Sequence, residues 1–235
     1  MGAGALPVDE HRRRPPIPIV PVDVRARDAA VAGGADEFGA WVAAASGVSE
    51  ERAEMRVIDT ADVEVLRTTL APRGDGSILS VGEVALAVDT GRGLAARAAG
   101  EGVHVLVATA ARDGSDAAAR ALADGLAAPG DHGPLGALRR LGDAPIAVVC
   151  GVALGAGEHG LGCVAAGAAA LAGAAVAAGI EPDLRSRLIA VDVPADDPLV
   201  RRLGIGVLPE AAVAWALGAT PSGTGPPAAP PPAPR

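Results

Sequence analysis

The sequence contains no Lys, Asn, Gln or Tyr among its 235 residues, and aromatic residues make up only 1% of it. Arg therefore supplies every fixed positive charge, and the core has to be built from Ala, Val, Leu and Ile. Acidic residues outnumber Lys and Arg by 28 to 20, which gives a net charge of −8. Because nucleic-acid binding requires clustered cations that neutralise phosphates, this composition argues against a nucleic-acid partner.

Cysteine and histidine are also scarce. The two cysteines, Cys150 and Cys163, make a poor disulfide framework or zinc site, and we expect them to be small buried hydrophobic residues. The four His are too scattered for metal-ligand spacing, so we expect neither a metal nor a cofactor. The N-terminus lacks the apolar segment of a signal peptide, which predicts a cytoplasmic protein.

One long apolar run dominates the chain. Residues 145–180 carry Glu158 and His159 as their only ionisable side chains apart from the cysteines. The uncharged stretch 161–180 has the length of a membrane span, but its many Ala and Gly residues give little transfer energy per residue. We therefore predict a Gly/Ala-rich helix over residues 163–178, buried on all sides in a globular core.

Strand-like and helix-like segments alternate along the rest of the chain. The spacing of apolar residues, caps and turns predicts strands at 55–59, 103–108 and 188–193, and helices at 23–45, 80–99, 117–127, 135–141 and 210–217. A further short helix is expected to begin at Asp197-Pro198. Residues 146–150 fit either a strand or a helix. The alternation predicts an α/β fold with a mainly parallel sheet. We expect disordered ends at 1–16 and 220–235 and one domain over 17–219.

The turn at residues 111–116 follows the most convincing strand and leads into a helix. In open α/β sheets, ligands bind beyond the carboxyl ends of the strands, and a helix N-terminus attracts anions. Gly114 and Ser115 suit close approach of a phosphate, and Arg112 is able to pair with it. Asp113 and Asp116 add negative charge and allow a second interpretation, an ordinary turn that caps the helix.

Two glutamates stand in otherwise apolar surroundings. Glu158 lies beside His159, which would suit acid–base chemistry or an exposed turn between two apolar segments. Glu210 follows Pro209 at the start of a predicted helix, where the helix dipole favours a negative charge.

Several segments together resemble the nicotinate-nucleotide:dimethylbenzimidazole phosphoribosyltransferase (CobT) family. Residues 20–59, with GGADEF and MRVID, are similar to its G-G-A-A-x-N and V-V-D run. Residues 134–180 resemble its L-x-x-L-G-G-x-E-I-A-A block, and residues 80–107 and 188–214 resemble the segments on either side. The resemblance covers residues 19–219.

The resemblance implies a Rossmann-like α/β domain with a reduced second domain, and a homodimer. It implies transfer of phosphoribose from nicotinate mononucleotide to 5,6-dimethylbenzimidazole, a step in making the lower ligand of cobalamin. Glu210 falls on the family's catalytic glutamate, the general base. The family's phosphate loop falls on residues 109–116. The implied substrate-binding residues are Gly33, Gly34, Asp113 and Glu158.

The sequence departs from the family pattern at both the phosphate loop and the catalytic glutamate. The phosphate loop has become TAARDGSD, and the glycines beside the catalytic glutamate have become Pro209 and Ala211. The chain is also about a third shorter than a typical member. A second hypothesis is therefore a catalytically inactive homologue that acts as a ligand-binding or regulatory subunit, alone or paired with a full-length relative.

Overall fold

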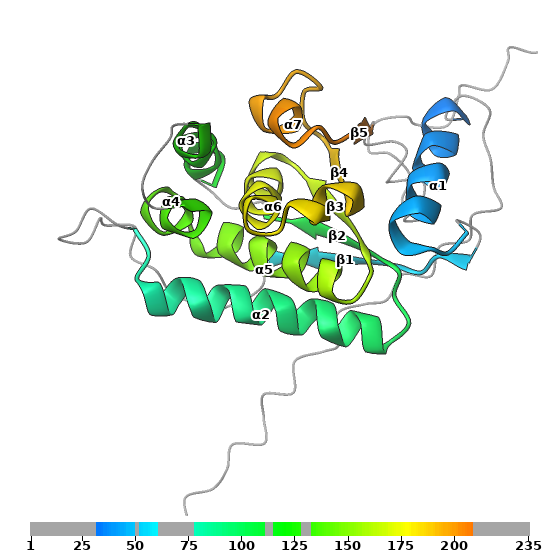
Figure 1. The fold of residues 1–235 in the computed structure, drawn as a ribbon, viewed down its shortest axis with the longest axis horizontal. Helices are drawn as coiled ribbons and strands as arrows, with labels where there is room; N and C mark the ends of the chain where they lie inside the picture. Colours follow the sequence, from blue (N-terminus) through cyan, green and yellow to red (C-terminus); the bar gives the residue numbers. More distant parts are fainter. Residues whose placement is uncertain (1–31, 50–51, 61–77, 111–114, 128–132, 209–235) are drawn as a thin grey trace, which may run out of the picture.

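The computed structural model describes residues 32–49, 52–60, 78–110, 115–127 and 133–208 (Figure 1). Its helices are α1 (Ala32–Ser46), α2 (Val81–Gly100), α3 (Ser115–Ala127), α4 (Gly133–Leu141), α5 (Ala144–Glu158), α6 (Ala168–Ile180), the 3-10 helix η3 (Pro182–Arg187) and α7 (Pro198–Leu203). Its strands are β1 (Met55–Asp59), β2 (Val105–Thr109), β3 (Gly162–Ala166), β4 (Leu188–Val191) and β5 (Val207–Leu208).

The five strands form one parallel sheet in the order β1-β2-β3-β4-β5. Consecutive parallel strands joined by right-handed crossovers place all the connecting helices on one face of the sheet. Ile58, Leu106 and Ala165 point to that face and join its core. The opposite face is covered by α1, where Phe38 and Val42 pack against the remaining strand residues. The predicted α/β fold with a parallel sheet is confirmed.

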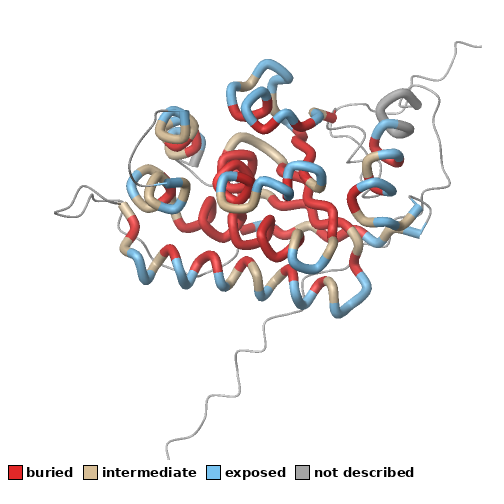
Figure 2. The backbone as a smooth tube through the Cα atoms, viewed as in Figure 1, coloured by how far each residue is buried: buried red, intermediate tan, exposed pale blue. Residues whose placement is uncertain are grey.

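Helix α5 lies between the sheet and α2, so the connecting helices form two layers (Figure 1). Figure 2 shows α5 buried along nearly its whole length, whereas α2 is buried on one side only. Asp143 starts α5, since its carboxylate accepts a hydrogen bond from the backbone N–H of Ile146 at 2.9 Å. Residues 146–150, which the sequence left undecided, are helical.

Helix α2 begins as the sequence predicts. Ser80 and Glu83 form a reciprocal capping box: the Ser80 hydroxyl accepts from the Glu83 N–H at 3.1 Å, and the Glu83 carboxylate accepts from the Ser80 N–H at 2.6 Å. The α7 start is also as expected, with Asp197 as the cap and Pro198 in the first turn.

The predicted single buried helix over residues 163–178 is wrong. Cys163 lies in β3, and the helix α6 begins only at Ala168, after Gly167 adopts a left-handed φ of 84°. A central parallel strand is covered on both faces, so its residues read as a continuous apolar run without alternation. Such a run has the same appearance as a buried helix.

Among the residues that the structure describes, no helix is both long enough and apolar enough to cross a membrane. The predicted domain limits at residues 17 and 219 lie outside the described ranges and stay predictions.

Candidate functional site

All five strands end at one edge of the sheet because they are parallel. The last residues of the strands at this carboxyl edge are Asp59, Thr109, Ala166, Val191 and Leu208. Every segment that follows a strand therefore leaves the sheet from the same side, which is where open α/β sheets bind ligands.

Two predicted site segments follow strands that end at this edge. Residues 111–114 come just after β2, and residues 209–210 come directly after β5. The strands β3 and β4 lie between them, so the two departure points are three strand spacings, about 14 Å, apart. Arg112, Asp113, Gly114 and Glu210 themselves lie outside the described residues, and their roles stay predictions.

A buried hydroxyl group joins β1 to β2 at the same edge. Thr60, which follows β1, is fully buried, and its hydroxyl donates a hydrogen bond of 2.8 Å to the carbonyl oxygen of Thr109. Asp59, one residue earlier, is exposed. This hydrogen bond holds the carboxyl end of β1 against the carboxyl end of β2, at the edge where the candidate site lies.

The start of α6 is a further feature of this edge, and the sequence interpretation missed it. Gly167 is the N-cap, its N–H donates to the carbonyl oxygen of Val191 at 2.9 Å, and no side chain of the described residues caps the helix. The first N–H groups of an uncapped helix carry partial positive charge and favour an anion. The sequence signal for this helix start was Gly167, which separates a strand-like segment from an Ala-rich one. The prediction of one long helix placed this glycine in the helix interior.

The remaining predicted residues belong to helices. Gly33 and Gly34 belong to the first turn of α1, and Ser115 begins α3. Glu158 is the last residue of α5, just before β3 begins, so it lies at the amino edge of the sheet. The length of β3 separates that edge from the carboxyl edge by about 16 Å.

Glu158 forms an ion pair across the α2–α5 interface. Its Oε1 lies 3.1 Å from Nε of Arg92, and both side chains are partly exposed. The Nε–H group is buried but not directed at the carboxylate, so it makes no hydrogen bond. An exposed ion pair of this kind contributes little to stability. His159 follows in the turn that leads to β3.

The two cysteines are buried and free, as predicted. Burial raises the pKa of both thiols to about 12, and the nearby Arg92 charge opposes that rise only at Cys150. Neither thiol is therefore a nucleophile near neutral pH. Within the described ranges, no group of three or more His, Cys, Asp or Glu side chains is placed to hold a metal ion.

No family model and no curated protein matches this sequence. Solved structures do match its fold. A nicotinate-nucleotide-dimethylbenzimidazole phosphoribosyltransferase from Thermus thermophilus superposes with a TM-score of 0.56 at 24% identity, over 63% of this chain and 57% of that chain. A CobT structure from the same organism superposes with a TM-score of 0.55 at 23% identity, over 61% of this chain and 56% of that one.

These comparisons confirm the resemblance to the CobT fold that the sequence motifs indicated. The chain spans somewhat more than half the length of the solved structures it matches. At this level of identity the likeness concerns the fold, and the activity has to be argued from the site.

Proposed function

We propose that this chain is a phosphoribosyltransferase that transfers phosphoribose from nicotinate mononucleotide to a benzimidazole-type base at the carboxyl edge of its sheet. The observation that carries the proposal is that β2 and β5 are parallel and end at the same edge. The predicted phosphate loop follows one strand and the predicted general base follows the other. We place this activity in the cytoplasm.

Glu210 acts as the general base in this reaction. Its carboxylate takes the proton from one nitrogen of the benzimidazole while the other nitrogen forms a bond to C1′ of the ribose. The bond from C1′ to the nicotinate nitrogen breaks, and nicotinate leaves with that electron pair. A positioned base of this kind contributes about 10²–10⁴ to a rate.

The phosphate of the nucleotide binds between the segment after β2 and the start of α6. Arg112 supplies a positive charge, and Gly114 and Ser115 allow close approach. The uncapped N–H groups that follow Gly167 lie one strand further along the same edge. Gly33, Gly34 and Asp113 contact the rest of the substrate.

A non-catalytic homologue is the second candidate function. It is favoured by the sequence TAARDGSD at residues 109–116, which lacks two glycines and the Asn-Thr-Thr of the family's loop. A backbone that approaches phosphate closely tolerates glycine far better than residues with a Cβ. Such a protein would bind the nucleotide and release no nicotinate, and it would act alone, as a homodimer or with a full-length relative.

Purified full-length chain incubated with nicotinate mononucleotide and dimethylbenzimidazole tests the first proposal. We expect nicotinate and the ribosylated base in equal amounts, measured by chromatography. Glu210→Gln should lower the rate at least about 100-fold. Asp183→Asn, at an exposed position of η3, is the matched control and should not change it.

Thermal unfolding in the presence of nicotinate mononucleotide separates the two candidates. A ligand at 100 times its dissociation constant stabilises the folded state by about 2.7 kcal/mol, whether or not turnover follows. Stabilisation without nicotinate release supports the non-catalytic homologue. If nicotinate mononucleotide does not stabilise the protein and no nicotinate is released, both candidate functions are contradicted. Glu158→Gln, measured in the same way, decides whether that residue contributes to binding.

A further inference from the structure

One residue at the end of a strand has an unusual backbone conformation. Among the described residues, Asp192 is the only one other than glycine with a positive φ, which is 57°. This left-handed region is disfavoured for residues that carry a Cβ, although Asp tolerates it better than most. Residues held in it cluster at active sites and ligand-binding sites, so the conformation of Asp192 indicates a possible role in the site.

Asp192 lies at the carboxyl edge of the sheet, directly after β4. The carbonyl oxygen of Val191 accepts a hydrogen bond of 2.9 Å from the N–H of Gly167, at the start of α6. Bond lengths then place the Cα of Asp192 within about 6 Å of the Gly167 nitrogen. The peptide group before Asp192 is therefore anchored to the connection between β3 and α6, which fixes where Asp192 leaves the sheet.

The carboxylate of Asp192 is exposed and serves no visible purpose in the fold. Within the described part of the chain it has no hydrogen-bond or ion-pair partner, and it does not cap α6. An Asp that only shapes a turn commonly accepts a hydrogen bond from a backbone N–H two residues further on. Asp197 does so, with the N–H of Leu199 at 2.8 Å. Asp192 makes no such bond, so its carboxylate is available to a ligand.

The place of Asp192 along the edge corresponds to the place of the ribose in a nucleotide. The strand β4 lies two strands from β2, which the predicted phosphate loop follows, and one strand from β5, which Glu210 follows. These separations are about 10 Å and about 5 Å. In nicotinate mononucleotide the ribose links the phosphate to the reacting carbon C1′. A nucleotide that reaches from the phosphate loop toward Glu210 therefore places its ribose beside β4.

We propose that the Asp192 carboxylate binds the 2′- and 3′-hydroxyl groups of the nucleotide and makes the site selective for ribonucleotides over 2′-deoxyribonucleotides. The inference rests on the function proposed above. An ionised carboxylate is an acceptor only, and its two oxygens accept one hydrogen bond from each hydroxyl of a vicinal diol. A site that bonds a substrate hydroxyl in this way discriminates against an analogue that lacks it.

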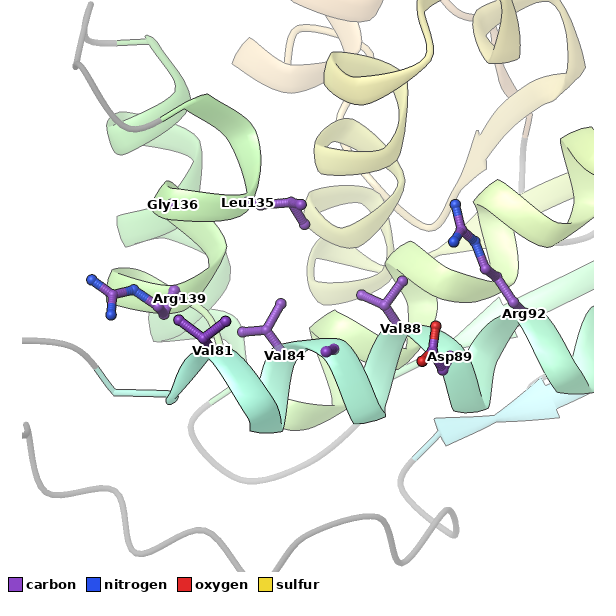
Figure 3. A pocket seen from close by; sticks show the side chains of 9 residues that line it. Val81, Val84, Val88, Asp89, Arg92, Leu135, Gly136 and Arg139 are labelled. Atoms are coloured by element: carbon purple, nitrogen blue, oxygen red, sulfur yellow. The ribbon is translucent and has the colours of Figure 1, made fainter.

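A groove between α2 and α4 offers a different binding place (Figure 3). Its volume is about 400 Å³, and Val84, Val88 and Leu135 form part of its apolar lining. Figure 3 shows Asp89 on the α2 side of this groove. The groove belongs to the outer helical layer, and α5 separates α2 from the sheet. Asp89 is exposed, as Asp192 is, so it provides a matched control.

Calorimetric titration of the full chain with nicotinate mononucleotide and with its 2′-deoxy analogue tests the proposal. We expect the wild type to bind the ribonucleotide at least about tenfold more tightly, because the analogue loses a hydrogen bond to a charged acceptor. Asp192→Asn keeps the shape of the side chain and tolerates the left-handed backbone. It should weaken ribonucleotide binding at least about tenfold and affect the deoxy analogue less. Asp89→Asn should change neither affinity.

Asp192→Gly separates binding from folding. Glycine adopts a positive φ without strain, and this relief offsets the greater freedom of the unfolded chain. Without ligand, the variant should therefore unfold at about the same temperature as the wild type. It should nevertheless lose as much ribonucleotide affinity as Asp192→Asn, a result that a purely structural role would not produce.

The possible failures are distinguishable. A wild type that binds nicotinate mononucleotide, with Asp192 variants that bind it equally well, would make Asp192 a turn residue only and leave the proposed function standing. Equal affinity of the wild type for both nucleotides would also overturn the inference. Loss of binding in Asp89→Asn would place the nucleotide in the groove. If the wild type binds neither nucleotide, the proposed function fails together with this inference.

Discussion

Gly151 on α5 lies directly against the backbone of Val88 on α2. A Cβ built at Gly151 would overlap the carbonyl oxygen of Val88 and come within 2.9 Å of its Cα. Gly91 on α2 meets the backbone of Val148 and Val152 on α5 in the same way. The two helices therefore touch along their backbones, and this contact joins the outer helical layer to the layer on the sheet.

The first prediction is that Gly151→Ala destabilises the protein even though alanine favours helices. The added methyl group meets backbone atoms, which cannot rotate away, and such overpacking costs about 1–3 kcal/mol. Denaturant unfolding measures the loss. Gly82→Ala, an exposed position of α2 with no atom within 4 Å of the Cβ, is the control. It should be neutral or stabilise by up to about 1 kcal/mol. Equal effects of the two changes would contradict the close contact.

A second prediction concerns the attachment of α1. The guanidinium of Arg187 donates hydrogen bonds from Nη1 to the carbonyl oxygens of Ala45, near the end of α1, and of Gly160, before β3, the latter at 2.9 Å. Arg187→Met should cost about 1–3 kcal/mol, because it leaves two carbonyl groups without this charged donor.

Hydrogen exchange shows which helices lose stability in the Arg187→Met variant. With Met at position 187, amide exchange in α1 should accelerate more than exchange in α6. Arg185→Met, two residues earlier and exposed, should change neither. Uniform acceleration across both helices would show that Arg187 acts on the whole fold and not on α1.

The third prediction is that the buried thiols make stability fall at high pH. Burial raises the pKa of Cys150 and Cys163 from 9.0 to about 12. Above pH 9 the unfolded chain loses these protons while the folded chain keeps them, so the free energy of unfolding decreases between pH 9 and pH 12. Each thiol contributes a slope of about 1.4 kcal/mol per pH unit within this window.

Below pH 9 the two thiols add no pH dependence. The comparison is between the wild type and the double variant Cys150→Ala with Cys163→Ala, by denaturant unfolding at pH 8, 9.5 and 10.5. The variant should be less stable at pH 8 because of lost packing, and its stability should fall less steeply with pH. Parallel pH profiles would show that the thiols do not remain protonated in the folded state.

The fourth prediction concerns the hydrogen bond between Thr60 and Thr109 at the carboxyl edge. Thr60→Val removes the hydroxyl that donates to Thr109 and keeps the shape of the side chain. It leaves that carbonyl oxygen without this donor and should cost about 1 kcal/mol. Thr60→Ser keeps the hydroxyl and should lose less. If the edge binds nucleotide, Thr60→Val should also weaken the stabilisation by nicotinate mononucleotide more than Thr60→Ser does.

The amino-acid sequence by itself determined the fold class and several element limits. The capping box at Ser80 and Glu83, the cap at Asp197 and the β-branched run of β2 depend on contacts within a few residues, so they can be read locally. The order of the motifs also indicated the CobT fold, which the structural comparisons confirm.

Only the tertiary structure decided how residues 144–180 divide into α5, β3 and α6. Each of the three is buried on several sides, so hydrophobic periodicity, which depends on one exposed side, carries no information there. The structure also placed Glu158 at the amino edge of the sheet, opposite the strand ends that precede the predicted loops, and showed that no described side chain caps α6. These relations join residues that are distant in the chain, and they follow from the order of the strands in the sheet.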